Sequence, residues 1–255
     1  MHWKVFLASA TGKYHLDAAE PCQDAAHFAI RDEAFVGVVC DGAGSAEQGQ
    51  AGAQFLARAV TEGVAGALAS GCLTHSGGPG TVEQLQDIVR GARDALSRIA
   101  ASEQRVLRDF ASTLVGCFST PLGGCFFHIG DGFAVQRAGA GAAAGSGAIS
   151  LPENGEFADQ TYFVTDESWC EHLRVTPLGA VHPGCVIGLM SDGTASFAID
   201  RARTGFFGPF IDPVVTFLRK TGGDDGSLAL QNLLEGEKTF AITGDDKTLL
   251  LALAA

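Results

Sequence analysis

Three short apolar segments follow one another closely in this chain and constrain its fold more than any other feature. They cover residues 112–120, 124–129 and 133–137 and are rich in Val, Ile, Leu and Phe. The connections at 121–123 and 130–132 contain Gly, Pro or Asp, which favour tight turns. Because a parallel crossover needs a dozen or more residues, this spacing predicts two consecutive hairpins in an antiparallel sheet.

Two long amphipathic segments precede this group. Apolar residues recur every four positions over 56–68, and a second apolar stripe covers 85–99, which predicts two helices. Thr81 and Gln84 have the spacing of a capping box, and Gly and Pro residues at 77–80 separate the helices, so we expect an antiparallel pair. Further strands are predicted at 5–10, 34–40, 186–191 and 248–253, and further helices at 212–221 and 227–236. The pattern indicates an α+β fold with helices outside the sheets.

Composition narrows the functional classes. The 255 residues include 17 basic and 29 acidic side chains, a net charge of −12, and 46% are hydrophobic. The high apolar fraction argues against disorder, and the negative charge disfavours nucleic-acid binding. A protein this acidic would need bound cations to hold an anionic substrate. Composition changes too little along the chain to suggest a second domain, so we expect one domain over 1–255.

Cysteine usage and apolar run lengths indicate the compartment. The seven cysteines are odd in number, form no Cys-x-x-Cys motif and lie mostly in apolar runs, which favours buried free thiols in a reducing compartment. The apolar run at 5–8 is too short for a signal peptide, and no stretch approaches the length of a membrane span. We therefore expect a cytoplasmic protein that does not enter membranes.

Aspartates recur at the ends of the apolar segments, and several precede glycine. These residues are Asp24, Asp41, Asp131, Asp192, Asp245 and Asp246. An Asp-Gly pair alone is a common hairpin signal and needs no function. Taken together, carboxylates at strand ends can converge on one sheet edge, where they would repel one another unless cations were bound. Oxygen ligands without His or Cys favour Mg²⁺ or Mn²⁺, and two such ions are a common device for phosphoryl hydrolysis.

Seven short motifs in order give the chain a family resemblance. They are SATGKYH (9–15), PCQDA (21–25), VCDGAGS (39–45), STLVGC (112–117), IGDG (129–132), LMSDGTA (189–195) and GDDKTL (244–249). Together they resemble the metal-dependent protein serine/threonine phosphatases of the PP2C (PPM) type, in particular a bacterial subgroup. The resemblance covers the whole chain and implies an α-β-β-α sandwich of two antiparallel sheets flanked by helices. It also implies a flap-like insert around 138–184, whose Gly/Ala-rich start at 138–146 we expect to be mobile.

The resemblance also implies a set of metal ligands. Asp41 would bridge two metal ions, and the carbonyl of Gly42 would bind the second. Asp192 and Asp245 would complete the coordination of the first ion. Asp24 would hold water molecules on the second ion.

Asp131 and Asp192 would bind a third, looser ion that is typical of bacterial members. Where the family often has Asn-Glu-Asp, this chain has Cys22-Gln23-Asp24. Neutral Gln23 thus replaces a charged ligand of the second ion, and we expect that ion to be held more weakly or to be more hydrated.

Two further departures concern groups around the phosphate. His15 stands in for a family arginine that contacts phosphate, and the alternative is that His15 has a structural role only. Ala43 occupies the position at which animal members carry a histidine that acts as a general acid. The catalytic residues implied by the resemblance are therefore Asp41, Asp24 and His15.

These observations predict hydrolysis of phosphoserine and phosphothreonine in proteins by a metal-bridging water, with Mg²⁺ or Mn²⁺ as cofactor. The expected partners are phosphorylated proteins and a cognate Ser/Thr kinase, and we expect a monomer. The alternative, suggested by Gln23 and the altered arginine position, is a catalytically weak module that binds a kinase or phosphorylated partner through the same fold.

Overall fold

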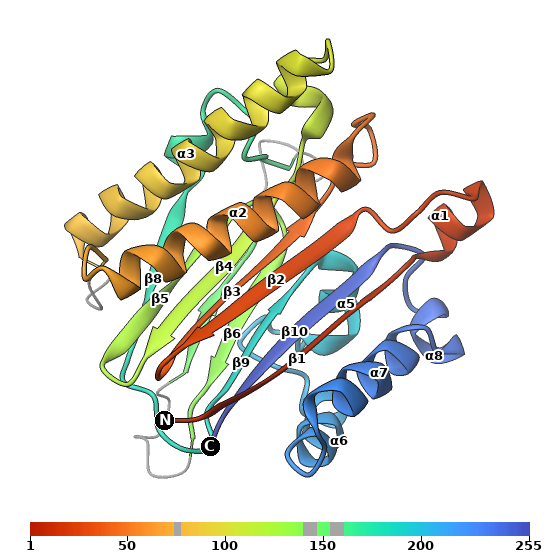
Figure 1. Ribbon diagram of the computed structural model, residues 1–255. Coiled ribbons are helices and arrows are strands. Elements are labelled where there is room, and N and C mark those ends of the chain that lie inside the picture. Colours follow the sequence, from red (N-terminus) through yellow and green to blue (C-terminus); the bar gives the residue numbers. More distant parts are fainter. Residues whose placement is uncertain (74–77, 140–146, 154–160) are drawn as a thin grey trace.

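The computed structural model describes residues 1–73, 78–139, 147–153 and 161–255 (Figure 1). Within these residues the strands form two antiparallel sheets of five strands each, packed face to face. Sheet A has the order β1 (Trp3–Ala10), β10 (Lys247–Ala254), β9 (Val186–Met190), β6 (Phe133–Arg137) and β7 (Ala148–Ser150). Sheet B has the order β2 (Asp24–Arg31), β3 (Ala34–Asp41), β4 (Leu114–Thr120), β5 (Gly123–Ile129) and β8 (Arg174–Leu178).

Helices cover the outer face of each sheet, which confirms the predicted α-β-β-α sandwich. In Figure 1, α2 (Gly49–Ala69) and α3 (Pro79–Ser102) lie side by side over sheet B. On the other side, α5 (Asp192–Ala198), α6 (Gly208–Leu218) and α7 (Gly223–Leu234) pack against sheet A. Short helices complete the described set: α1 (Lys13–Ala18), η1 (Leu107–Phe110, a 3₁₀ helix), α4 (Trp169–His172) and α8 (Glu237–Phe240).

The strand β10 shows why a sandwich of this kind has continuous apolar runs. Leu249 and Leu251 point into the apolar layer beneath the helices of sheet A. Leu250 and Ala252 point into the layer between the two sheets. Because successive side chains alternate between faces and both faces are buried here, an apolar residue is favoured at every position.

One of the two predicted hairpins is wrong. The turn at 121–123 joins β4 to β5 as expected, with Thr120 opposite Gly123. The turn at 130–132 instead carries the chain from sheet B to sheet A, where β6 pairs with β9. Gly130 has a φ of +105°, a conformation that glycine adopts without strain. A short turn with two glycines allows either path, so the local sequence does not distinguish a hairpin from a crossing between sheets.

The predicted pairing of the two long helices is confirmed, but the predicted capping box is not. Helix α3 begins at Pro79 with Gly78 at its N-cap, so Thr81 and Gln84 lie inside the helix. Proline is favourable at the first helical position because its missing N–H has no partner there anyway.

Strand β2 was not predicted because its pattern is weak. Only its first residue, Asp24, is buried, and most of the others are half-buried. Helix α5 was also missed, since its seven residues begin directly after β9 and start with an Asp-Gly pair that indicates a turn.

The structure also bears on the cysteines and on membrane insertion. All seven cysteines are free thiols, and Cys40, Cys117, Cys125 and Cys185 are buried.

No helix in the described part of the chain has the length and apolar character required to cross a bilayer.

Part of the insert predicted at 138–184, positions 140–146 and 154–160, lies outside the described residues, and the described part includes β7, α4 and β8. The mobility predicted for 138–146 and the flap therefore stay predictions.

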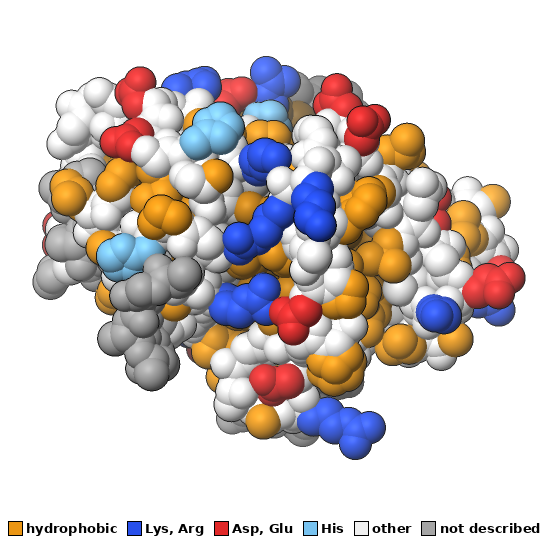
Figure 2. Space-filling view, turned by 90° about the horizontal axis from the view of Figure 1, so that it is seen from below, with side chains coloured by type: hydrophobic (Ala, Val, Ile, Leu, Met, Phe, Trp, Pro, Cys, Tyr) orange, Lys and Arg blue, Asp and Glu red, His pale blue; other side chains and the backbone are white. Residues whose placement is uncertain are grey.

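Lys and Arg side chains gather on the face that carries both termini, seen in Figure 2. In this region the ammonium of Lys4 donates to the carbonyl of Arg219 at 2.9 Å, and the Arg219 guanidinium donates to the carbonyl of Gly184. The predicted aspartates lie at the other end of the strands, where β1 ends and β2 and β10 begin. The candidate aspartates therefore lie away from this group of basic side chains.

Candidate metal centre

A cavity of about 310 Å³ lies at the edge of the two sheets, where the predicted aspartates converge. Its lining includes six of the predicted site residues: His15, Asp41, Gly42, Asp131, Asp192 and Asp245. Chain segments from both sheets supply these groups. No Lys or Arg lines the cavity among the residues that the structure describes.

The ends of the secondary-structure elements position the carboxylates. Asp41 is the last residue of β3, and its backbone N–H donates to the hydroxyl of Thr113 at 3.0 Å. Asp192 is the first residue of α5, Asp131 lies in the crossing between the sheets, and Asp245 stands two residues before β10. None of the Asp-Gly pairs at 41, 131 and 192 turns a hairpin, so that alternative reading does not hold for them.

Burial and mutual repulsion raise the pKa values of these carboxylates. The pKa of Asp41 lies well above its ordinary value, first because of burial and then because of the charges of Asp24, Asp192, Asp131 and Asp245. Burial, followed by the charges of Asp131 and Asp245, raises the pKa of Asp192 to about 6, although a hydrogen bond with Asp41 partly offsets this. Ionising all of these carboxylates together is therefore unfavourable without a nearby positive charge.

Asp24 lies behind the cavity rather than in its lining. It faces Asp41 across the β2–β3 pair and is only 5% exposed. One carboxylate oxygen, Oδ2, accepts a hydrogen bond of 2.7 Å from the hydroxyl of Ser191. Burial, and to a lesser degree the charges of Asp246 and Asp192, raises the pKa of Asp24 to about 7.

Two buried oxygen atoms in the cluster indicate what the site can bind. Oδ1 of Asp24 and Oδ1 of Asp192 have no hydrogen-bond partner in the described structure. A buried polar atom without a partner is costly, and acidic oxygens in such a position suit a hard divalent cation. The donor set of carboxylates and a backbone carbonyl therefore fits Mg²⁺ or Mn²⁺. Among the described residues, no three His, Cys, Asp or Glu side chains are arranged to hold a metal ion together. Binding of a cation would therefore require some of these side chains to rotate.

Asp246 organises one wall of the site and was not identified as a site residue from the sequence. Its carboxylate accepts hydrogen bonds from the backbone N–H groups of Gly12 and Gln23, both at 2.6 Å. It also contacts Nδ1 of His15 at 2.9 Å. Asp246 is 3% exposed. Its hydrogen bonds connect the N-terminal segment to the start of β10. The Asp-Asp pair in front of an apolar run was the available signal.

His15 lines the cavity, and its ring is held by Asp246. Its predicted contact with phosphate stays a prediction. Burial alone would lower the pKa of His15, but the hydrogen bond to Asp246 and the charges of Asp246, Glu20 and Asp245 raise it above its ordinary value.

Gln23 acts on the backbone next to Asp41. With its amide nitrogen turned toward them, the side chain donates to the carbonyl oxygens of Gly42 at 3.1 Å and Ala43 at 3.3 Å. The Gly42 carbonyl is the predicted ligand of the second metal ion. The Gln23 amide would therefore donate a hydrogen bond to the same oxygen atom that the ion would contact.

Three residues of the lining were not found by sequence reasoning. Tyr14 and Thr113 border the cavity, and the hydroxyl of Thr161 donates to Oδ2 of Asp131 at 2.6 Å. Tyr14 and Thr113 lie within two of the family motifs, SATGKYH and STLVGC, but no role was predicted for either residue.

The fold is an α-β-β-α sandwich with an acidic cavity at the shared edge of its two antiparallel sheets. The sequence profile of the family described as Protein phosphatase 2C matches residues 11–235. Serine/threonine-protein phosphatase 3 of Escherichia coli K12 is 32% identical over 268 aligned residues, which cover all of both chains. This chain belongs to the protein phosphatase 2C family.

Solved structures show the same fold. PppA, described as a key regulatory component of T6SS in Pseudomonas aeruginosa, aligns with a TM-score of 0.62 at 16% identity and covers 100% of this chain and 99% of its own. The serine/threonine phosphatase Stp1 from Staphylococcus aureus aligns with a TM-score of 0.61 at 14% identity, covering 100% and 96%. RsbX, solved in complex with magnesium, aligns with a TM-score of 0.58 at 11% identity, covering 100% and 96%.

Proposed function

We propose that this protein hydrolyses phosphoserine and phosphothreonine in proteins with the help of Mg²⁺ or Mn²⁺. The observation that carries the proposal is the convergence of four carboxylates on one cavity whose described lining contains no basic side chain other than His15. Family membership and the name of the E. coli relative support the same reaction.

The proposed ligands are those that the family resemblance implies, and most of them line the cavity. Asp41 would contact two ions, with Asp192 and Asp245 on one of them and the Gly42 carbonyl on the other. Asp131 and Asp192 border the outer side of the cavity and would hold a third, looser ion. Bound there, divalent cations would neutralise the phosphoryl oxygens and lower the pKa of a water molecule that attacks phosphorus.

Three further residues would act on water, on phosphate and on the leaving group. Asp24, held by Ser191 behind the cavity, would accept hydrogen bonds from water on the second ion. His15, held by Asp246, would present its other ring nitrogen as a contact for phosphate. Ala43 lines the cavity without a titratable group, so it supplies no proton to the departing serine oxygen.

Turnover with and without metal tests the proposal. We expect hydrolysis of para-nitrophenyl phosphate and of a phosphoserine peptide with Mn²⁺, and loss of both activities with excess chelator. Asp192→Asn should abolish most of the activity, whereas Asp94→Asn, at an exposed position on α3, should leave it unchanged. Wild-type protein that is inert toward both substrates would contradict the proposal and favour the binding module.

The physiological setting is part of the same proposal. The substrate would be a phosphorylated protein, and a Ser/Thr kinase that makes it would be the expected partner in signalling. We retain the expectations of a monomer and of a cytoplasmic location.

A further inference from the structure

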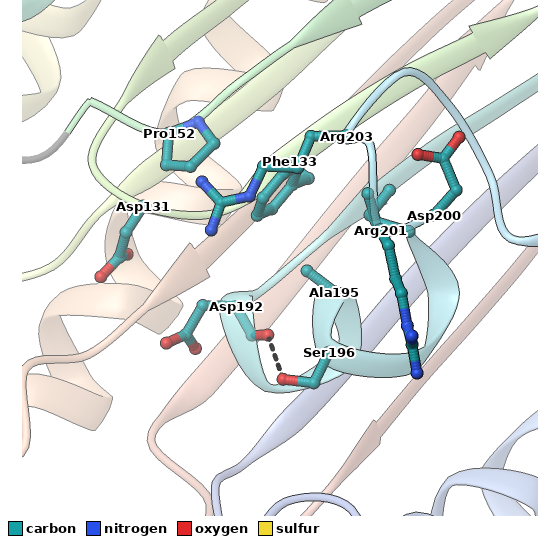
Figure 3. Close-up of a pocket in the computed structure, with 10 residues that line it drawn as sticks. Asp131, Phe133, Pro152, Asp192, Ala195, Ser196, Asp200, Arg201 and Arg203 are labelled. Atoms are coloured by element: carbon teal, nitrogen blue, oxygen red, sulfur yellow. Dashed lines mark hydrogen bonds between the residues drawn. The ribbon is translucent and has the colours of Figure 1, made fainter.

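A second cavity of about 400 Å³ opens beside the metal centre (Figure 3). Asp131 and Asp192 line both cavities, so the two adjoin at these carboxylates. Phe133 forms much of the floor together with Ala195 and Ile199. A phosphorylated side chain reaching the metal centre would therefore leave part of its peptide in this groove.

The far wall of the groove carries cationic side chains. Arg201 and Arg203 both belong to the lining, and both are exposed. Figure 3 shows the Arg203 side chain extending over the Phe133 ring toward the Asp131 end, whereas Arg201 points away from it. The guanidinium carbon of Arg203 lies 5.8 Å from the centre of the Phe133 ring, which is a cation–π contact.

The loop that presents Arg203 is ordered by its own hydrogen bonds. The carboxylate of Asp200 accepts from the backbone N–H and the hydroxyl of Thr204, at 3.0 and 2.8 Å. Ile199 and Phe206 form a bridge at its base. Asp200 also lines the groove, and these hydrogen bonds hold its carboxylate against Thr204.

The backbone at Arg203 has a defined conformation. Arg203 has a φ of +56°, in the left-handed region, as do Ala19, Asp32 and Gln104. Here the conformation is fixed by the hydrogen bond from the Arg203 N–H to the Asp200 carbonyl, at 3.0 Å.

We propose that this groove binds the peptide flank of the phosphorylated residue and that Arg203 selects substrates with an acidic side chain there. The inference rests on the proposed phosphatase function. Charge complementarity carries it: the metal centre would accept the phosphate, and of the two lining arginines Arg203 is the one whose guanidinium is directed toward the Asp131 end of the groove. Apolar floor residues would pack against the aliphatic part of the peptide.

Four substrates test the inference with the full-length, metal-loaded enzyme. They are para-nitrophenyl phosphate and three phosphoserine peptides that differ only in an adjacent residue, which is Glu, Gln or Lys. We expect kcat/KM to be highest for the Glu peptide. Arg203→Gln should remove this preference through KM, lowering kcat/KM for the Glu peptide about two- to fivefold, as for an exposed ion pair. Arg203→Glu should shift the preference to the Lys peptide.

Para-nitrophenyl phosphate serves as the control for folding and chemistry, because it has no flank. The two Arg203 variants should change its turnover less than that of the Glu peptide, and Arg98→Ala, at an exposed position on α3, should change none of the four rates. Equal wild-type rates on the three peptides would overturn the inference. Equal losses on peptide and aryl substrate would also overturn it, since Arg203 would then act on the phosphate or the fold. Inertness of the wild-type enzyme toward all four substrates would instead overturn the proposed function.

Discussion

Ser191 donates a hydrogen bond from its hydroxyl to the carboxylate of Asp24, at 2.7 Å, and so joins the two sheets directly behind the acidic cavity. The same hydroxyl oxygen accepts the backbone N–H of Thr248 at 3.0 Å. The Ser191 hydroxyl thus provides a hydrogen-bond partner for one oxygen, Oδ2, of a buried carboxylate in sheet B and for a backbone N–H group in sheet A. The relationship explains how a group as polar as Asp24 is tolerated at this depth.

Ser191→Ala should destabilise the protein by about 1–3 kcal/mol, because it leaves two buried polar groups without their partner. Denaturant unfolding in the presence of chelator measures this directly. Ser102→Ala is the matched control: its exposed hydroxyl donates to the carbonyl of Ile99, so its loss should change stability little. Equal stabilities of the Ser191 variant and the wild type would show that the bridge between the sheets contributes nothing.

Asp192→Asn should separate stability from metal binding. Removing one of several repelling carboxylates should increase the free energy of unfolding in chelator, by about 1 kcal/mol. The same change removes a proposed ligand, so the stabilisation produced by Mn²⁺ should shrink. Thermal melts with chelator and with a Mn²⁺ series check both effects, with Asp94→Asn as the control on α3. A variant that is less stable without metal would refute the view that the carboxylates repel one another.

Gln23→Glu should make the protein more dependent on metal. The new carboxylate would face the carbonyl oxygens of Gly42 and Ala43, so the variant should be less stable in chelator than the wild type. With Mn²⁺ the added charge should tighten binding of the second ion, which titration calorimetry would record as a lower Kd. Gln54→Glu, at an exposed position on α2, adds the same charge away from the site and should do neither. Unchanged Mn²⁺ affinity in Gln23→Glu would show that the residue at position 23 does not influence binding of the second ion.

His128 should contribute a pH dependence of stability that is separate from the metal centre. Burial, and then the charge of Arg174, lowers the pKa of His128 to about 3, and its Nδ1 atom contacts the hydroxyl of Ser150 at 2.9 Å. Between pH 6.5 and about 3 the unfolded chain binds a proton that the folded His128 does not. Stability from this residue is therefore complete above pH 6.5 and is lost as pH falls, by up to about 1.4 kcal/mol per pH unit.

His128→Gln removes the titrating group, so its stability should fall less steeply than that of the wild type over this window. Chemical unfolding at a series of pH values, with chelator present, measures the difference in slope. Parallel pH profiles for the two proteins would mean that His128 is protonated in the folded state.

Much of this architecture could be predicted from local sequence, for a physical reason that also explains the failures. Runs such as 248–253 indicate strands because both of their faces are buried, and Asp41 and Asp192 are noticeable because a charge ends each such run. Strand β2 has no such contrast, since most of its residues are half-buried.

The destination of a turn is a long-range property that local sequence does not contain. The turn at 130–132 could equally have closed a hairpin, and only the pairing of β6 with β9 sends it across to the other sheet. The role of Asp246 could not be predicted for a similar reason, although its position before an apolar run was evident. Its three partners at Gly12, His15 and Gln23 are more than 220 positions away in sequence.

The central claim is that Asp41, Asp192 and Asp245 hold a pair of divalent ions in the acidic cavity. An anomalous difference map from crystals grown with Mn²⁺ tests it most directly. We expect two Mn²⁺ peaks about 4 Å apart, with the Asp41 carboxylate between them. Absence of any peak in the cavity, with full Mn²⁺ in the crystal, or peaks bound only elsewhere on the protein, would contradict it.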